Sequence, residues 1–196
     1  MNPSAGKKLL LHCCCAPCGT HPFRTLRERF DVTAYFDNPN IQPAEEYRVR
    51  LMEIRELAKR WGFSVVEGEY DSEDWFSAIR GHENEPEGAA RCEICYRIRL
   101  ERTARMAKIF GMDCFATTLS VSPHKKAEII NRIGKQAGDQ IGIQFVEADF
   151  KKKDGFKISC ELSRAEGLYR QDYCGCTFSR RGGREPSRSI RVDPVV

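Results

Sequence analysis

The 196-residue chain contains no long apolar run. A membrane-spanning helix needs about 18 or more consecutive apolar residues, and no segment approaches that length. The chain also shows no charged-then-apolar leader and no internal repeat. Its first predicted strand is not followed by a Gly/Ser-rich loop of the kind that binds phosphate. We therefore expect a cytoplasmic protein of one domain, with no membrane partner.

Cysteine, in contrast, is abundant, with ten residues in a chain long enough to fold without disulfide staples. In a reducing cytosol such a surplus indicates metal binding or catalysis rather than structural bridges. The cysteines form groups at 13–18, 92–95 and 174–176, with Cys114 and Cys160 alone. We expect these two single residues to be packed thiols.

Apolar segments of strand length alternate with segments of helical period. This alternation predicts βαβ units and an α/β fold with a mostly parallel, five-stranded, doubly wound sheet. Such sheets bind ligands at the carboxyl ends of their strands, where the first strand meets the first cysteine group. Ser122 and Pro123 predict the start of a helix. Strands are expected at 8–12, 32–36, 63–67, 114–119 and 144–148, and the last helix is expected to end near residue 170.

Four cysteines follow the first predicted strand within six residues: Cys13, Cys14, Cys15 and Cys18. Adjacent cysteines cannot easily meet the geometry of a disulfide, so we interpret these thiols as ligands of a soft metal. Cys13 is ambiguous, because a continued strand alternation would point it away from Cys14. The segment from Cys15 to Cys18 is also typical of a thioredoxin-type redox motif before a helix.

Cys92 and Cys95 are predicted to open a helix, where backbone amides and the helix dipole stabilise thiolates. Together with Cys14 and Cys15 they supply four thiolates, the number that holds a [4Fe–4S] cluster. Zinc is the competing metal. Structural zinc sites, however, normally pair two cysteine knuckles about 12 to 20 residues apart, and these two pairs are much farther apart in the chain.

Cys174 and Cys176 are separated by a single glycine. A disulfide between them would close a small, strained ring, which raises the reduction potential and favours reversible redox chemistry. We expect this pair to act as an electron relay.

Taken together, these motifs resemble the cobalamin-independent epoxyqueuosine reductases of the QueH family over about residues 8–178. Cys13 stands where that family accepts various residues, and His124 where an aromatic is common. The matching pieces are Leu11-His12 with Cys14-Cys15-Ala16-Pro17-Cys18, Asn38-Pro39-Asn40-Ile41 with Pro43 and Glu46-Tyr47-x-x-Arg50, Arg91-Cys92-x-x-Cys95-Tyr96-x-x-Arg99-Leu100, Thr117-Thr118-Leu119 with Ser122-Pro123, and Tyr169-Arg170-Gln171-x-Tyr173-Cys174-Gly175-Cys176.

The resemblance implies an adenine-nucleotide α-hydrolase-like fold and an oxidoreductase that reduces epoxyqueuosine to queuosine in the anticodon loop of tRNA. We expect a single α/β metalloenzyme domain at residues 1–178 with a helical and basic C-terminal extension. Little apolar content remains after residue 178, so we expect a basic, flexible tail at 179–196. An unidentified electron donor would serve as a further partner. Carried over by motif, Cys14, Cys15, Cys92 and Cys95 would hold a [4Fe–4S] cluster, Cys174 and Cys176 would be the redox-active pair, and Cys18 is the leading candidate ligand for an additional mononuclear iron.

Epoxide removal consumes protons, for which Asp37, Glu46 and Tyr173 are alternative donors. An unpaired anticodon base can stack on an aromatic side chain, and Lys and Arg can hold its phosphates. Residues 151–191 carry eleven Lys and Arg against five Asp and Glu. The candidate stacking groups are Tyr35, Phe36, Tyr96, Tyr169 and Tyr173, and the candidate phosphate contacts are Lys151, Lys152, Lys153, Arg180 and Arg181.

Two other functions compete with this one. An ATP-using, tRNA-modifying enzyme of the related nucleotide-binding fold would need a phosphate loop where this chain has cysteines. A non-catalytic iron–sulfur or zinc protein that binds RNA would not need the Cys174 and Cys176 pair.

Overall fold

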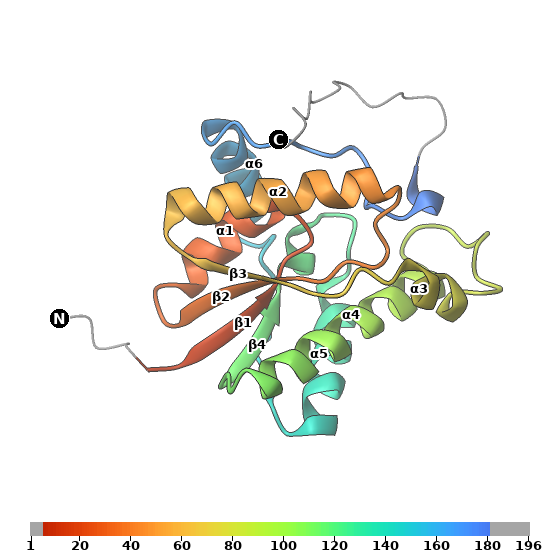
Figure 1. Cartoon of the computed structure of the whole chain (residues 1–196), viewed down its shortest axis with the longest axis horizontal. Helices are drawn as coiled ribbons and strands as arrows, with labels where there is room; N and C mark the ends of the chain where they lie inside the picture. Colours follow the sequence, from red (N-terminus) through yellow and green to blue (C-terminus); the bar gives the residue numbers. More distant parts are fainter. Residues whose placement is uncertain (1–5, 181–196) are drawn as a thin grey trace, which may run out of the picture.

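The computed structural model describes residues 6–180. One sheet runs through the centre of the molecule (Figure 1). Its strands are β1 (Lys8–His12), β2 (Asp31–Phe36), β3 (Ser64–Glu67), β4 (Cys114–Thr117) and β5 (Gln144–Phe145). All strand pairs are parallel, in the order β3-β2-β1-β4-β5, with Leu10 of β1 between Thr33 of β2 and Phe115 of β4. The expected five-stranded, doubly wound α/β fold is confirmed.

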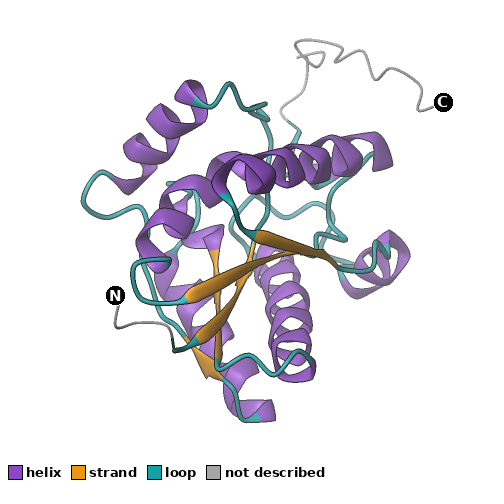
Figure 2. Ribbon diagram, turned by 60° about the vertical axis from the view of Figure 1, so that its left-hand side comes forward, coloured by secondary structure: helices purple, strands orange, loops and turns teal. Residues whose placement is uncertain are grey.

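Helices cover both faces of the sheet (Figure 2). They are α1 (Ala16–Leu26), α2 (Ala44–Trp61), α3 (Ser72–Ala78), α4 (Ala90–Ile109), α5 (Ala127–Ile141) and α6 (Gly155–Ala165), with single turns η1 (Thr118–Val121) and η2 (Thr177–Ser179). In Figure 1, α1, α2 and α6 lie on one face of the sheet, and α4 and α5 lie on the other. Each face therefore has its own apolar core.

The side chains of β1 divide between these two cores. Leu9 and Leu11 pack toward α1 and α2, whereas Leu10 packs toward α4 and α5. Successive strand residues point to opposite faces, so a strand covered on both sides reads as one apolar run. The alternation continues past the strand, because Cys13 packs in the first core and Cys14 against the second. This confirms that Cys13 points away from Cys14.

Local signals explain most helix ends. Asp71 accepts a hydrogen bond from the Asp74 amide and caps α3, a position that favours aspartate. The helices α2 and α5 end at Gly62 and Gly142, whose φ values of 69° and 68° are left-handed. Glycine takes this conformation without steric cost.

The segment after β4 differs from the prediction. β4 ends at Thr117 rather than Leu119, because the Thr117 hydroxyl accepts the Leu119 amide and starts η1. Ser122 and Pro123 do not open a helix, since the Ser122 hydroxyl accepts the His124 amide in a turn and α5 begins only at Ala127. Residues 118–126 therefore form a connection beyond the carboxyl end of β4.

Two other predicted elements are longer than the observed ones. β5 ends at Phe145, and the Ala148 amide then donates to the Asn131 side chain instead of joining the sheet. α6 ends at Ala165, close to Gly167 with its φ of 64°. From residue 181 on, the expected tail lies outside the described residues, and so does Arg181. Across residues 6–180, no helix has the length and apolar character needed to cross a membrane.

Candidate functional site

Three cysteines meet at the carboxyl ends of the neighbouring strands β1 and β4. The chain leaves β1 toward α1 on one face of the sheet and leaves β4 toward α5 on the other face (Figure 1). The Cys14 amide donates to the Thr118 hydroxyl at 3.3 Å, and its Sγ lies 3.5 Å from the same oxygen. Because α1 begins directly after Cys15, Cys18 lies in its first turn. The sulfur atoms of Cys14, Cys15 and Cys18 all lie within 4.8 Å of one another, and we call these residues the sulfur triad.

The three sulfurs of the triad shift one another's pKa values. Hydrogen bonds from Cys15 and Cys18 lower the pKa of Cys14 well below its usual value, and the charges of Arg99 and Lys125 lower it further. The same contacts have the opposite effect on the donors. The hydrogen bond to Cys14 raises the pKa of Cys15 to about 12, and hydrogen bonds to Cys14 and Cys15 raise the pKa of Cys18.

This donor set fits a soft metal. Thiolate ligands lie about 2.3 Å from a metal such as zinc, so sulfurs within 4.8 Å of one another can surround one ion. A metal would displace the protons that Cys15 and Cys18 now share with Cys14. The spacing supports Cys18 as a ligand beside the other two.

Three cysteines belong neither to the sulfur triad nor to the pairs Cys92/Cys95 and Cys174/Cys176. Each has a different environment. Cys13 donates to the Leu11 carbonyl oxygen and is buried in the first core. Cys114 is buried at 1% exposure, as expected. Cys160 is partly exposed and lines a cavity, so its prediction as a packed thiol is wrong. Ser159 and Ser163 on the buried face of α6 line the same cavity.

The other four cysteines form a second sulfur group, made of Cys92, Cys95, Cys174 and Cys176. Cys92 and Cys95 lie in the first two turns of α4, as expected, and Cys95 shares a small apolar cluster with Cys176. Burial, with a smaller contribution from the nearby Cys174, raises the pKa of Cys95 to about 11 against the lowering effect of Arg99. The ligand set of Cys14, Cys15, Cys92 and Cys95 remains a prediction, although Cys14 and Cys92 pack against the same core.

The segment that carries Cys174 and Cys176 is held in place by Arg50. This buried side chain donates to the Cys174 carbonyl at 3.0 Å and to the Tyr173 carbonyl at 3.2 Å, and it pairs with Glu46 at 2.7 Å. Gly175 has a φ of 125°, and a Cβ atom there would lie 2.9 Å from the Ile41 side chain. Glycine is therefore required between the two thiols in this conformation.

A cavity of about 260 Å³ brings the two sulfur groups together. Cys14 and Cys18 of the sulfur triad line it, and so does Cys174 of the second group. Lys125 and Phe156 also line the cavity, and Phe156 is 39% exposed. The cavity is thus surrounded by two cysteines of the sulfur triad, by Cys174 of the expected redox pair, by the cationic Lys125 and by the exposed ring of Phe156.

Arg99, one helical turn after Cys95, connects α4 to the sheet. Its Nη1 lies 3.9 Å from Cys95 Sγ, and its Nη2 donates to Asn38 Oδ1 at 2.5 Å. Its Nε lies 3.2 Å from His12 Nε2, which also lies 3.2 Å from the Asp37 carbonyl oxygen, and His12 Nδ1 lies 2.8 Å from the Thr117 hydroxyl. Burial lowers the pKa of His12 to about 3, so the ring is neutral.

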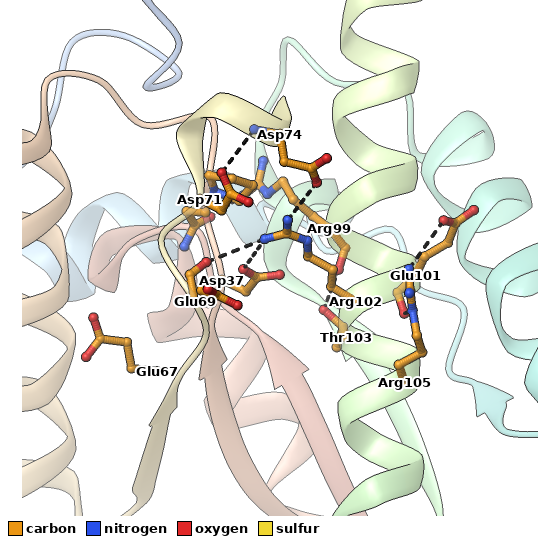
Figure 3. A network of polar contacts seen from close by, with 12 residues as sticks. Asp37, Glu67, Glu69, Asp71, Asp74, Arg99, Glu101, Arg102, Thr103 and Arg105 are labelled. Atoms are coloured by element: carbon orange, nitrogen blue, oxygen red, sulfur yellow. Dashed lines mark hydrogen bonds and ion pairs between the residues drawn. The ribbon is translucent and has the colours of Figure 1, made fainter. Parts of the chain in front are cut away.

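Arg102 lies three residues further along α4 and has carboxylate partners (Figure 3). Its Nη1 lies 3.5 Å from Asp37 and its Nη2 lies 2.8 Å from Asp74. Asp37 is fully buried, and burial raises its pKa to about 6 despite this ion pair. Asp37 and Glu46 do not line the cavity, whereas Tyr173, the third candidate proton donor, does.

Several predicted contacts with RNA are occupied by the protein itself. Tyr35, Phe36 and Tyr96 are at most 5% exposed, so their prediction as stacking groups is wrong; they pack in the cores between sheet and helices. The Tyr173 ring lies between the guanidinium groups of Arg50 and Arg180, at 5.2 and 5.0 Å. Both Arg180 and Tyr173 are thereby committed to a contact within the protein.

Some of the remaining candidate RNA contacts are also occupied by the protein itself, and others are exposed. Tyr169 donates to Glu46 at 3.0 Å. Lys151 pairs with Asp149 at 3.2 Å and donates to the Lys125 carbonyl, whereas Lys152 and Lys153 are exposed. The phosphate contacts therefore stay predictions, with Lys152 and Lys153 the free members of the basic run.

Sequence reasoning missed four residues of the site. Arg99 and Gln171 lie within recognised motifs but were given no role, although Arg99 falls one turn after Cys95 and Gln171 donates to Cys15 Sγ at 2.8 Å. Lys125 was assigned to the first turn of a helix, which hid its position at the cavity. Phe156 gave no signal, because a single exposed aromatic is common.

Comparisons with known proteins agree with this site. The family model described as Epoxyqueuosine reductase QueH matches residues 9–182. Relatives bearing that name include one from Thermotoga maritima, 37% identical over 185 residues, covering 93% of this chain and 95% of the relative. Another, from Streptococcus pyogenes serotype M1, is 37% identical, covering 90% of this chain and 71% of the relative. A third, from Acinetobacter baylyi, is 37% identical, covering 91% and 83%.

Among solved structures, the U34-tRNA thiolase NcsA from Methanococcus maripaludis with its [4Fe-4S] cluster superposes with a TM-score of 0.52. It is 12% identical, and the match covers 88% of this chain and 62% of the thiolase, so the likeness is one of fold. It agrees with the fold type that the resemblance implied. With a family model that spans the sheet and both sulfur groups, and relatives of more than one third identity, the chain belongs to the epoxyqueuosine reductase QueH family.

Proposed function

We propose that the protein reduces the epoxide of epoxyqueuosine to queuosine in the anticodon loop of tRNA. Family membership supplies the reaction. The observation that supports it within this chain is the single cavity that joins Cys14 and Cys18 of the sulfur triad to Cys174 of the second group. The proposed metal ligands and one thiol of the proposed redox pair thus line the cavity in which we place the substrate.

The two thiols of Cys174 and Cys176 balance the reaction. Removal of the epoxide oxygen leaves an alkene and one water, and it consumes two electrons and two protons. Oxidation of the two thiols to one disulfide breaks two S–H bonds, forms one S–S bond, and releases two electrons and two protons. A separate electron donor must then return the disulfide to two thiols before the next turnover.

Cys14, Cys15, Cys92 and Cys95 would hold a [4Fe–4S] cluster, and Cys18 would bind an additional iron. The close sulfurs of the triad and the lowered pKa of Cys14 support this assignment. Such a group, when bound, supplies one-electron transfer and Lewis-acid polarisation of an oxygen. Arg50 meanwhile holds the backbone of Cys174 so that its thiol faces the cavity.

Phe156 is the stacking surface that this proposal assigns to the modified base. It lies at the start of α6, lines the cavity and leaves 39% of its surface exposed. An anticodon base is unpaired and can be splayed out, and base stacking on an aromatic ring contributes about 1–3 kcal/mol. The exposed Lys152 and Lys153 immediately before α6 can approach the adjacent phosphates.

The reaction is tested with protein purified without oxygen, its iron restored, and an anticodon stem-loop that carries epoxyqueuosine. Nucleoside mass spectrometry should show queuosine after addition of a chemical reductant. Binding of the stem-loop without conversion, by protein that contains full iron, would instead favour the non-catalytic RNA-binding alternative.

Substrate recognition is tested separately by Phe156→Ala. Loss of about 1–3 kcal/mol of stacking should weaken binding of the same stem-loop roughly 5- to 150-fold. Phe110→Ala is the matched control, because Phe110 is also 39% exposed but does not line the cavity. Equal effects of the two changes would remove Phe156 from the proposal.

A further inference from the structure

Two basic side chains at the sulfur site have no acidic partner among residues 6–180. Arg99 is 1% exposed, and its three hydrogen-bond partners are a histidine ring, an amide oxygen and a thiol. Arg102, on the same helix, shows the usual arrangement, since it extends to Asp37 and Asp74 (Figure 3). The charge of Asp37 is within reach of Arg99, but its ion pair is with Arg102.

Lys125 approaches the same sulfurs from another element, the connection between η1 and α5. It lines the cavity together with Cys14 and Cys174. Although burial opposes it, the neighbouring Cys174, Tyr96 and Cys14 groups raise the pKa of Lys125. Arg99 contacts Cys95 Sγ at 3.9 Å and is also influenced by Cys14 and Cys174, so both cations act on Cys14 and Cys174.

Arg50 is a third basic group near the sulfurs, and it differs from Arg99 and Lys125. It is as buried as Arg99, but Glu46 neutralises it at 2.7 Å. Arg99 and Lys125 form no such ion pair within residues 6–180, although Glu87 and Asp172 also line the cavity. A buried charge without a counter-charge is costly, so a negative charge at the sulfurs would stabilise Arg99, which is 1% exposed.

We infer that Arg99 and Lys125 are positioning charges for the iron–sulfur group, which stabilise its reduced form and make it easier to reduce. This inference rests on the proposed function. A cluster held by four thiolates is an anion, and one-electron reduction adds a further negative charge. Fixed positive charges nearby favour the added electron by Coulomb attraction, which is strong where water is excluded.

The experiment measures the midpoint potential of the cluster in Lys125→Gln by anaerobic titration with dithionite, followed by visible absorption and electron paramagnetic resonance. Removing one charge should make reduction roughly tenfold less favourable, a decrease of about 59 mV for a one-electron couple. Lys125→Arg keeps the charge and should keep the parent potential. Lys126→Gln is the matched control, because Lys126 is exposed and does not line the cavity.

Iron and sulfide are counted in each variant before titration. A lower potential in Lys125→Gln, with parent values in Lys125→Arg and Lys126→Gln, supports the inference. Loss of iron in Lys125→Gln that Lys125→Arg restores also supports it, since charge is then what the site requires. Iron loss in both Lys125 variants, or an unchanged potential at full iron content, overturns it.

Arg99→Gln extends the test to the second cation and should lower the potential in the same direction. Its iron content is compared with that of Arg99→Lys, which keeps the charge. If Lys125→Gln instead weakens only stem-loop binding and leaves the potential unchanged, Lys125 is a phosphate contact and the inference is wrong. Absence of iron from the parent protein would overturn the proposed function and this inference together.

Discussion

The sulfur triad and the second sulfur group are built in opposite ways. The triad comes from one short segment, in which the end of β1 and the start of α1 fix all three thiols. The second group joins the start of α4 to a segment without regular structure, held by side chains far away in sequence. A locally fixed set of donors suits a permanently bound metal, whereas a segment held by hydrogen bonds suits thiols that must change partners during turnover.

The largest effect should follow removal of a triad sulfur. Cys14→Ala or Cys15→Ala should lose most of the bound iron, because each removes a ligand that no neighbouring thiol replaces in the proposed set. Cys114→Ala, at another buried thiol, should keep its iron. Iron and sulfide per chain measure the difference, and full iron content in a Cys92→Ala/Cys95→Ala double variant would refute the four-cysteine ligand set.

The second group should respond differently. Cys174→Ser should retain iron but lose multiple turnover, since one thiol cannot form the disulfide that supplies both electrons. Cys160→Ser is its control, because Cys160 lines the same cavity without a redox partner in the proposal. The measurement is queuosine formed per enzyme over time, and turnover at the parent rate would end the relay role of Cys174.

Stability should separate the two regions as well. Arg50→Met leaves Glu46 and two carbonyl groups without their partner, and it should lower the free energy of unfolding by about 3–5 kcal/mol. Arg48→Met removes only an exposed pair with Glu45 and should cost about 0–1 kcal/mol. Urea denaturation measures both. Similar values for the two variants would mean that the Cys174 segment is not anchored through Arg50.

A smaller, pH-dependent effect should appear at Asp37, beside the site but outside the cavity. Its pKa rises from 3.8 to about 6 on folding, so the folded protein favours the neutral carboxyl group. The free energy of unfolding should therefore decrease by about 3 kcal/mol as the pH rises from about 4 to 6. Asp37→Asn should lack this decrease.

Urea denaturation at pH 4 and pH 7 tests this expectation. Neither Asp37 carboxyl oxygen accepts a hydrogen bond from a described residue, so asparagine can replace the neutral acid. The parent and variant should be similar at pH 4, and the variant should be more stable at pH 7. A parallel pH dependence in both proteins would contradict the raised pKa.

What could be predicted from the sequence follows the same division. The β1 run and the group from Cys13 to Cys18 are local, so strand alternation could indicate that Cys13 points away from Cys14, which the structure confirms. The ambiguity that the sequence left at Cys13 is resolved in this way, whereas the close approach of Cys18 to Cys14 and Cys15 is seen only in the structure. The Ser122 prediction failed because the Thr117 hydroxyl ends β4 early and starts η1, a choice between two local signals that only the fold decides. Because α5 begins only at Ala127, Lys125 lies in the connection before this helix, where it lines the cavity.

Long-range contacts account for the other errors. Cys160 and Cys114 are both isolated in sequence, and only the packing of α6 shows that one of them faces the cavity. The aromatic candidates Tyr35 and Tyr96 belong to elements whose depth depends on helices on either side of the sheet. Their residue type could not distinguish a stacking surface from core.

The last segment that the structure describes is attached to residues near the start of the chain, and this determines the order in which parts of the protein can fold. The Gln42 amide donates to the Gly175 carbonyl at 2.9 Å, and the Gln42 side chain accepts the Thr177 amide at 3.3 Å. Arg50 adds its hydrogen bonds to the Tyr173 and Cys174 carbonyls, so residues early in the chain hold this last segment at the cavity wall. During synthesis the sheet and the sulfur triad can therefore form before this segment, the last that the structure describes, takes its place at the cavity wall.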